Sequence, residues 1–120
     1  MGKMFAIHEL ELRPGISGDD FERFMQEEGL KLLPPIAGQR TYLLKGDRGH
    51  RAGKYAFLIE FESTEARDRL FPEDGVASEE AQQYFGSEVV QRVLATWGTL
   101  STSPGNDTVW TDYMSIPSRQ

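Results

Sequence analysis

The alternation at residues 54–62, KYAFLIEFE, restricts the possible folds more than any other part of the sequence. One parity of this segment is wholly apolar, and the other parity mixes apolar residues with two glutamates. Successive side chains of a strand point to opposite faces of a sheet, so such a strand buries one of its faces completely. The segment therefore predicts a strand with Phe57 and Ile59 in the core and Glu60 on the opposite face.

Three further segments alternate in the same way and predict strands at residues 4–12, 39–45 and 108–116. Helical patterns separate these strands. Ser17 is a suitable N-cap for a first helix, which Pro34 ends.

A second, short helix is predicted to open at Ser63 and to run through about Phe71. Residues 78–99 are predicted to be helical in two pieces divided near Gly86, and residues 101–106 to form a loop.

The resulting order, β-α-β-β-α-(α)-β, predicts one ferredoxin-like α+β domain over residues 1–120, with a four-stranded antiparallel sheet and helices on one face. The other face would then be bare. We assign Leu10, Leu58 and Trp110 to that face, and a patch of this kind marks an interface or a ligand site. Pairing of two copies through these faces would cover it, so a homodimer is expected.

Composition excludes several classes of function. The chain has no cysteine, which excludes disulfides, thiolate metal sites and a cysteine nucleophile. Its formal net charge is -6, and such a chain repels the phosphate backbone of nucleic acids. No apolar run approaches the roughly 20 residues that a membrane span needs, and no signal-peptide core is visible. We therefore expect a cytoplasmic protein without nucleic-acid or membrane partners.

Two junctions carry a resemblance to a known family. The first strand ends in Arg13-Pro14-Gly15 before a helix, and residues 61–66, FESTEA, join the third strand to the next helix. With the order of elements along nearly the whole chain, they resemble the dimeric α/β-barrel superfamily. That group includes antibiotic-biosynthesis-type monooxygenases, small polyketide cyclases, muconolactone isomerases and stress-responsive barrel proteins. The resemblance implies a dimer that encloses a barrel.

In several members of this superfamily, a polar residue midway along the first strand projects into the barrel. His8 lies where the haem-degrading members carry an essential asparagine. Those members also use a histidine on the later helix, and the apolar stripe of this chain at residues 89–97 contains none. The resemblance therefore implies a functional role for His8 and argues against haem, so no cofactor is expected.

His8 and Glu60 form the candidate catalytic pair. The first and third strands are neighbours in this fold, and His8 shares a parity with Leu10, which we assign to the barrel side. Histidine titrates near neutrality, and a carboxylate in a partly closed barrel is expected to have a raised pKa. The alternatives are a histidine hydrogen-bonded in an ordinary interface, and a glutamate that is exposed or paired with Arg40.

Aromatic and polar groups share faces of the second and fourth strands, as in a ligand pocket. The candidate ligand contacts are Arg40, Tyr42, Leu58, Trp110 and Asp112. The same mixture is typical of a dimer interface, where tyrosine, tryptophan and arginine are enriched, and the sequence leaves both interpretations open.

The loop at residues 45–54 holds four basic residues around three glycines. Backbone amides in such a loop can bind an anion, although the Gly-Lys-Ser/Thr ending of a phosphate-binding loop is missing. A solvated, mobile hairpin is the simpler interpretation. His8 and His50 have no metal-ligand spacing, so no metal site is expected.

These patterns support three functional hypotheses. In the first, the chain is a cofactor-independent monooxygenase, cyclase or isomerase that acts on a small apolar or aromatic compound in the barrel. In the second, the same pocket belongs to a non-catalytic ligand-binding or stress-related homodimer. In the third, side chains fill the barrel and the dimer is structural. An open cavity separates the third hypothesis from the others, and turnover separates the first from the second.

Overall fold

The structure is a computed structural model that describes residues 2–102 and 110–117. Its elements are β1 (Met4–Leu12), α1 (Gly18–Phe24), the π-helical turn η1 (Met25–Gly29), α2 (Leu30–Leu32), β2 (Gln39–Lys45), β3 (Tyr55–Phe61), α3 (Thr64–Leu70), α4 (Glu79–Gly86), α5 (Glu88–Leu100), β4 (Ser101–Thr102) and β5 (Trp110–Met114). The strands predicted at residues 4–12 and 39–45 have these bounds, and β3 is one residue shorter than predicted at each end. The division of the last helical region near Gly86 is also confirmed.

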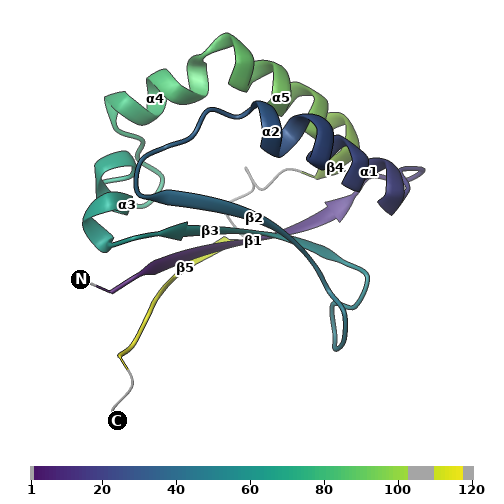
Figure 1. Ribbon diagram of the computed structural model, residues 1–120, viewed down its shortest axis with the longest axis horizontal. Helices are drawn as coiled ribbons and strands as arrows, with labels where there is room; N and C mark the ends of the chain where they lie inside the picture. Colours follow the sequence, from purple (N-terminus) through teal and green to yellow (C-terminus); the bar gives the residue numbers. More distant parts are fainter. Residues whose placement is uncertain (1, 103–109, 118–120) are drawn as a thin grey trace.

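The central strands β1 and β3 pair antiparallel, with β2 and β5 at the two edges, in the order β2-β3-β1-β5. The helices lie together on one side of the sheet, and the other side carries no helix among the described residues (Figure 1). We call the two sides the helix-covered face and the open face. The short β4, which pairs with the end of β1, corrects the predicted loop at Ser101 and Thr102; residues 103–106 lie outside the described residues.

The first helix begins as predicted but does not continue as a regular helix. The Ser17 hydroxyl accepts a hydrogen bond from the amide of Asp20 at 3.1 Å, which caps α1. The chain then widens into η1, where Met25 and Gly29 are both buried. A Cβ atom on Gly29 would lie 2.8 Å from the Met25 sulfur, so a larger residue at this position would require the Met25 side chain to shift.

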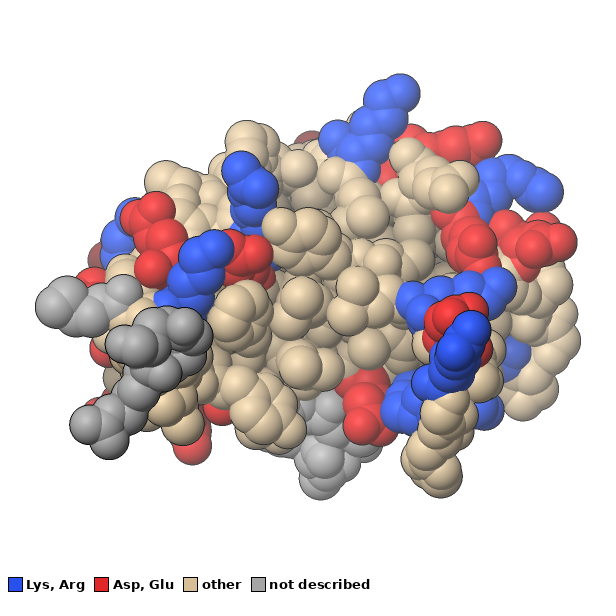
Figure 2. Space-filling model, turned by 60° about the horizontal axis from the view of Figure 1, so that its bottom comes forward, with Lys and Arg blue, Asp and Glu red and all other residues tan. Residues whose placement is uncertain are grey.

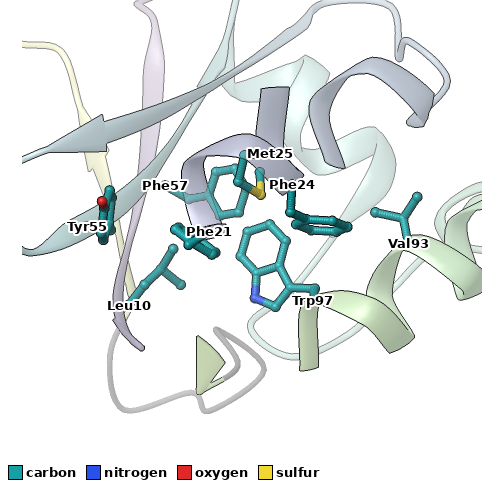
Figure 3. Close-up of a cluster of buried hydrophobic side chains, with 8 residues drawn as sticks. All are labelled: Leu10, Phe21, Phe24, Met25, Tyr55, Phe57, Val93 and Trp97. Atoms are coloured by element: carbon teal, nitrogen blue, oxygen red, sulfur yellow. The ribbon is translucent and has the colours of Figure 1, made fainter. Parts of the chain in front are cut away.

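The core lies between the helices and the sheet. Its larger cluster joins β1 and β3 to α1, η1 and α5 (Figure 3), and consists of Leu10, Phe21, Phe24, Met25, Tyr55, Phe57, Val93 and Trp97. The Phe57 ring stacks on the Trp97 indole, with ring centroids 4.3 Å apart and an interplanar angle of 15°. The prediction that Phe57 lies beneath the helices is confirmed.

A second cluster lies at the other end of the same face, under α3 and α4. Its buried members are Met4, Ala6, Phe61, Leu70 and Ala81, and Ile59 packs against them. The two clusters together account for the wholly apolar parity of β3. The helix-covered face is therefore one layer with two adjacent centres of packing.

A polar contact fixes α1 to the sheet beside the larger cluster. The Tyr55 hydroxyl donates a hydrogen bond to the Glu22 carboxylate, which Lys45 approaches to 3.0 Å. These two hydrogen bonds, first that of Tyr55, hold the pKa of Glu22 below its ordinary value of 4.5. The ionised carboxylate is thus favoured by the folded state.

We expect Glu22→Gln to lower stability at neutral pH and to weaken its dependence on acid. A carboxyl whose pKa is depressed by folding contributes stability above its unfolded pKa, and that contribution is lost as the pH falls through the folded pKa. Urea midpoints measured from pH 7 down to pH 3 should therefore fall less steeply for the variant than for the wild type below about pH 4.5. The exposed Glu27→Gln is the matched control; equal acid slopes for all three proteins would contradict the assignment.

Candidate functional site

The open face presents rows of side chains that the ladder register brings side by side. The first row across the four strands is Arg40, Glu60, Phe5 and Tyr113. The second row is Tyr42, Leu58, Ile7 and Thr111, and the third contains Leu44, Ala56 and Glu9. Figure 2 shows that uncharged side chains occupy the middle of this face, while charged groups gather toward its two ends. The face is therefore apolar and aromatic in its middle and polar at its margins.

One end of this face carries a polar group of four residues, Lys3, Arg40, Tyr42 and Glu60, which we call the polar corner. The Lys3 ammonium lies 2.9 Å from one oxygen of the Glu60 carboxylate. The Tyr42 hydroxyl donates to the other oxygen at 3.4 Å. Arg40 lies directly opposite Glu60 in the ladder. The structure thus brings together Arg40, Tyr42, Leu58 and Glu60 on one face.

The charge state of Glu60 differs from the prediction. A raised pKa was expected for this carboxyl, but the hydrogen bond from Lys3 lowers its pKa, and Tyr42 and Arg40 act in the same direction. A hydrogen bond with the Tyr42 hydroxyl raises the pKa of the Arg40 guanidinium. The polar corner therefore holds an ionised carboxylate between cations, not a neutral acid poised to exchange a proton.

A shallow depression opens at this corner. It has a volume of about 180 Å³ and is lined by Gly38, Gln39, Arg40, Glu60 and Glu62. Sites that enclose a small molecule usually measure about 300–1,000 Å³. The depression is therefore smaller than a typical site that encloses a small molecule.

His8 does not lie on the open face. It pairs with Phe57 across β1 and β3, whereas the partner of Glu60 is Phe5. Residues directly opposite each other in an antiparallel ladder extend to the same side of the sheet. His8 therefore belongs to the helix-covered face, and the prediction that it faces the barrel beside Glu60 is wrong. The predicted placement of Leu10 on the open face is also wrong, because Leu10 is only 1% exposed and lies beneath the helices.

His8 instead marks the boundary between the two core clusters. Its same-face neighbours along β1 are Ala6, in the smaller cluster, and Leu10, in the larger one. The imidazole is half-buried. It is a titratable group of β1 in an otherwise apolar stretch of the helix-covered face.

Asp112 also lies on the helix-covered side, opposite Ala6 in the ladder. Its carboxylate forms an ion pair with Arg67 of α3 at 2.6 Å, so it ties the edge strand β5 to the helical layer. The predicted grouping of Asp112 with the ligand contacts of the open face is therefore wrong. The backbone of Trp110 pairs with His8 in the ladder; its side chain lies outside the described part of the structure.

The loop at residues 45–54 is fastened to the sheet. The Arg51 guanidinium donates to the backbone carbonyls of Leu10 and Tyr55 at 3.2 and 2.9 Å. Each of the four basic residues of this loop forms an ion pair with a carboxylate. The pairs are Lys45–Glu22, Arg48–Asp47, Arg51–Glu11 and Lys54–Glu11. The hairpin bends away from the helices (Figure 1), and its paired charges leave little excess for an anion.

Two residues of these polar groups were not predicted from the sequence. Lys3 precedes β1, and its parity with Phe5 is a signal that could have placed it on the open face beside Glu60. Arg67 has no such signal, because it lies on α3, and strand parity does not predict which helix meets Asp112 of β5. Within the described residues, no three histidine, cysteine, aspartate or glutamate side chains gather as a metal site would require.

Comparisons with known proteins bear on the fold. No protein-family model matches the chain, and no curated protein matches it. Among solved structures, it resembles an uncharacterized NIPSNAP-like domain protein from Burkholderia xenovorans, with a TM-score of 0.62 and 16% identity over 98% of this chain and 86% of that one. It also resembles a dabb family protein with a ferredoxin-like fold from Mesorhizobium loti, with a TM-score of 0.53 and 15% identity over 99% and 100%.

The chain has a ferredoxin-like fold. Its α+β architecture, with an antiparallel sheet and helices, is the one predicted from the sequence. Identities this low establish a shared fold, and a fold by itself does not determine an activity. Among the described residues, no helix combines the length and the apolar character that crossing a membrane would require.

Proposed function

We propose that the chain is a cytoplasmic, homodimeric small-molecule-binding protein. Two copies meet through the apolar middle of their open faces, and the polar corner at the margin of this contact receives a small apolar or aromatic ligand. One observation carries this proposal: an apolar and aromatic sheet face that no described helix covers ends in a compact group of charged and hydroxyl side chains.

The apolar middle supports the dimer. Phe5, Ile7 and Leu58 are only half-buried, and the aromatic residues Tyr42 and Tyr113 stand at the two edges of the sheet. Contiguous apolar surface of this kind marks interaction sites. A second copy presents the same surface and is self-complementary in a twofold arrangement.

The polar corner supports the ligand. Leu58 and the Tyr42 ring offer apolar surface in the row next to Arg40 and Glu60. Binding sites commonly combine an apolar lining with a few convergent polar groups. A second copy that covers the neighbouring apolar row at Leu58 would deepen the shallow depression into a cleft.

The enzymatic form of this proposal is a monooxygenase, cyclase or isomerase that uses no cofactor. In this form, His8 and Glu60 have separate roles. His8 is on the helix-covered face, so Glu60 of the same chain does not orient it. Proton transfer by His8 would serve a ligand that enters between the sheet and the helices. Turnover of a bound compound distinguishes this form from a binding protein.

The ligand site is tested by NMR with a panel of small aromatic compounds. We expect indole, phenol and phenylacetate at millimolar concentration to shift the Leu58 methyl and Tyr42 ring signals. The Val93 methyls, buried on the helix-covered face, serve as the internal control. Shifts confined to Val93 and His8 would move the site between sheet and helices, and unchanged spectra with every compound would contradict ligand binding.

A further inference from the structure

We propose that the ligand carries a single carboxylate, and that Arg40 binds it. This inference rests on the proposed function, because it names the chemical class of the ligand at the polar corner. The carboxylate would occupy the depression beside Arg40, and a body of about one aromatic ring or a short alkyl chain would lie over Tyr42 and Leu58.

Arg40 differs from most other cations of the chain in its surroundings. Within residues 2–102 and 110–117, three basic residues form no ion pair with a carboxylate: Arg13, Lys31 and Arg40. The Arg13 guanidinium donates to the Gly98 carbonyl at 2.6 Å, beyond the end of β1. Lys31 is exposed on α2. Arg40 alone among these three lies on the open face, beside a row of aromatic and apolar side chains.

The carboxylate opposite Arg40 is already engaged. Glu60 accepts from Lys3 at 2.9 Å and from Tyr42 at 3.4 Å, so both of its oxygens have donors. Arg40 is exposed, and its planar fork of donors matches a carboxylate in a bidentate geometry. An incoming carboxylate would therefore bind Arg40 without breaking an existing ion pair of Arg40.

The spacing of the strand limits the size of the ligand. Arg40 and Tyr42 extend to the same side of β2, and same-face residues of a strand are about 6.6 Å apart. That distance accommodates one ring between a carboxylate on Arg40 and the apolar row at Tyr42 and Leu58. Glu60 and Glu62 also line the depression, and Arg40 is its only lining cation among the described residues, so a second carboxylate there would meet two like charges with no further cation. Monocarboxylates are therefore preferred to dicarboxylates.

The test compares an acid with its neutral counterpart. Phenylacetate and 2-phenylethanol share a phenyl group and differ in the charged end. In NMR titrations of the wild-type protein, phenylacetate should bind about 10-fold tighter or more, as expected of a charge-assisted hydrogen bond pair. Arg40→Ala should weaken phenylacetate about 10- to 100-fold and leave 2-phenylethanol unchanged. Lys31→Ala, which also removes an unpaired exposed cation, is the matched control and should bind both compounds like the wild type.

The possible results separate the two proposals. Equal affinities for acid and alcohol, with Arg40→Ala unchanged, would overturn the carboxylate assignment and leave the ligand site standing. Absence of binding by both compounds would overturn the carboxylate assignment, and it would overturn the ligand site as well if indole and phenol also fail to bind. Light scattering on Arg40→Ala adds a second readout: a variant that becomes monomeric would show that Arg40 serves the contact between copies, which also overturns its assignment to the ligand.

Discussion

Replacing Phe57 by alanine is expected to lower the free energy of unfolding by about 3–5 kcal/mol, the usual cost of removing a buried phenylalanine. Phe57 is 7% exposed and stacks on Trp97 with ring centroids 4.3 Å apart. The stacked pair joins the middle of the sheet to α5, so truncation leaves a cavity that neither layer can fill by a small movement.

Urea unfolding followed by tryptophan fluorescence measures this loss. Leu94→Ala is a suitable control, because Leu94 lies on α5 beside Val93 but is 41% exposed. Its substitution should cost less than about 1 kcal/mol. A loss of similar size in both variants would mean that the stack with Trp97 does not hold the helical layer to the sheet.

The arrangement of the elements followed from the sequence because β3 has only one possible orientation. Its parity through Phe57 and Ile59 is wholly apolar, and the other parity carries two glutamates. Burying the wrong side would place Glu60 and Glu62 in the core at a high cost. Prolines and glycines between the segments then set the lengths of the elements, which is why β1 and β2 also have the predicted bounds.

The predicted placement of His8 beside Glu60 was wrong because β1, unlike β3, does not have one wholly apolar side and one charged side. Both parities of β1 are largely apolar near its start, with Phe5 and Ile7 on one side and Met4 and Ala6 on the other. The direction of His8 therefore had no local signal, and a shift of one residue moves every side chain to the other face. The register with β3, which sets His8 opposite Phe57, is a property of the assembled sheet.

The lowered pKa of Glu60 and the π-helical turn also arise from contacts across the fold. Lys3 and Glu60 are 57 positions apart and meet only because β1 and β3 are neighbours. The turn at Met25 lets that side chain enter the core beside α5 while Gly29 allows the close approach. The sequence of α1 predicts a helix in this region, and tertiary packing decides where it widens.

The open face is a consequence of the two-layer architecture. A sheet with helices on one side must present its second face to solvent or to a partner. In this chain that face combines the apolar Ile7 and Leu58 at its middle with tyrosines at its edges. Dimerisation would bury on the order of 2,000 Å² in total, a typical area for an obligate contact.

Leu58→Asp is therefore expected to dissociate the dimer. At micromolar concentration, light scattering of the wild type should give twice the 13.6 kDa mass of one chain, and the variant should give the single mass. A twofold contact places the new carboxylate in the interface twice, and two desolvated charges that cost about 2 kcal/mol or more each raise the dissociation constant about 1,000-fold. Leu94→Asp, on the exposed side of α5, should remain a dimer with an unchanged circular dichroism spectrum. A wild-type mass of 13.6 kDa, or a dimeric and folded Leu58→Asp, would show that the open face is not where two copies meet.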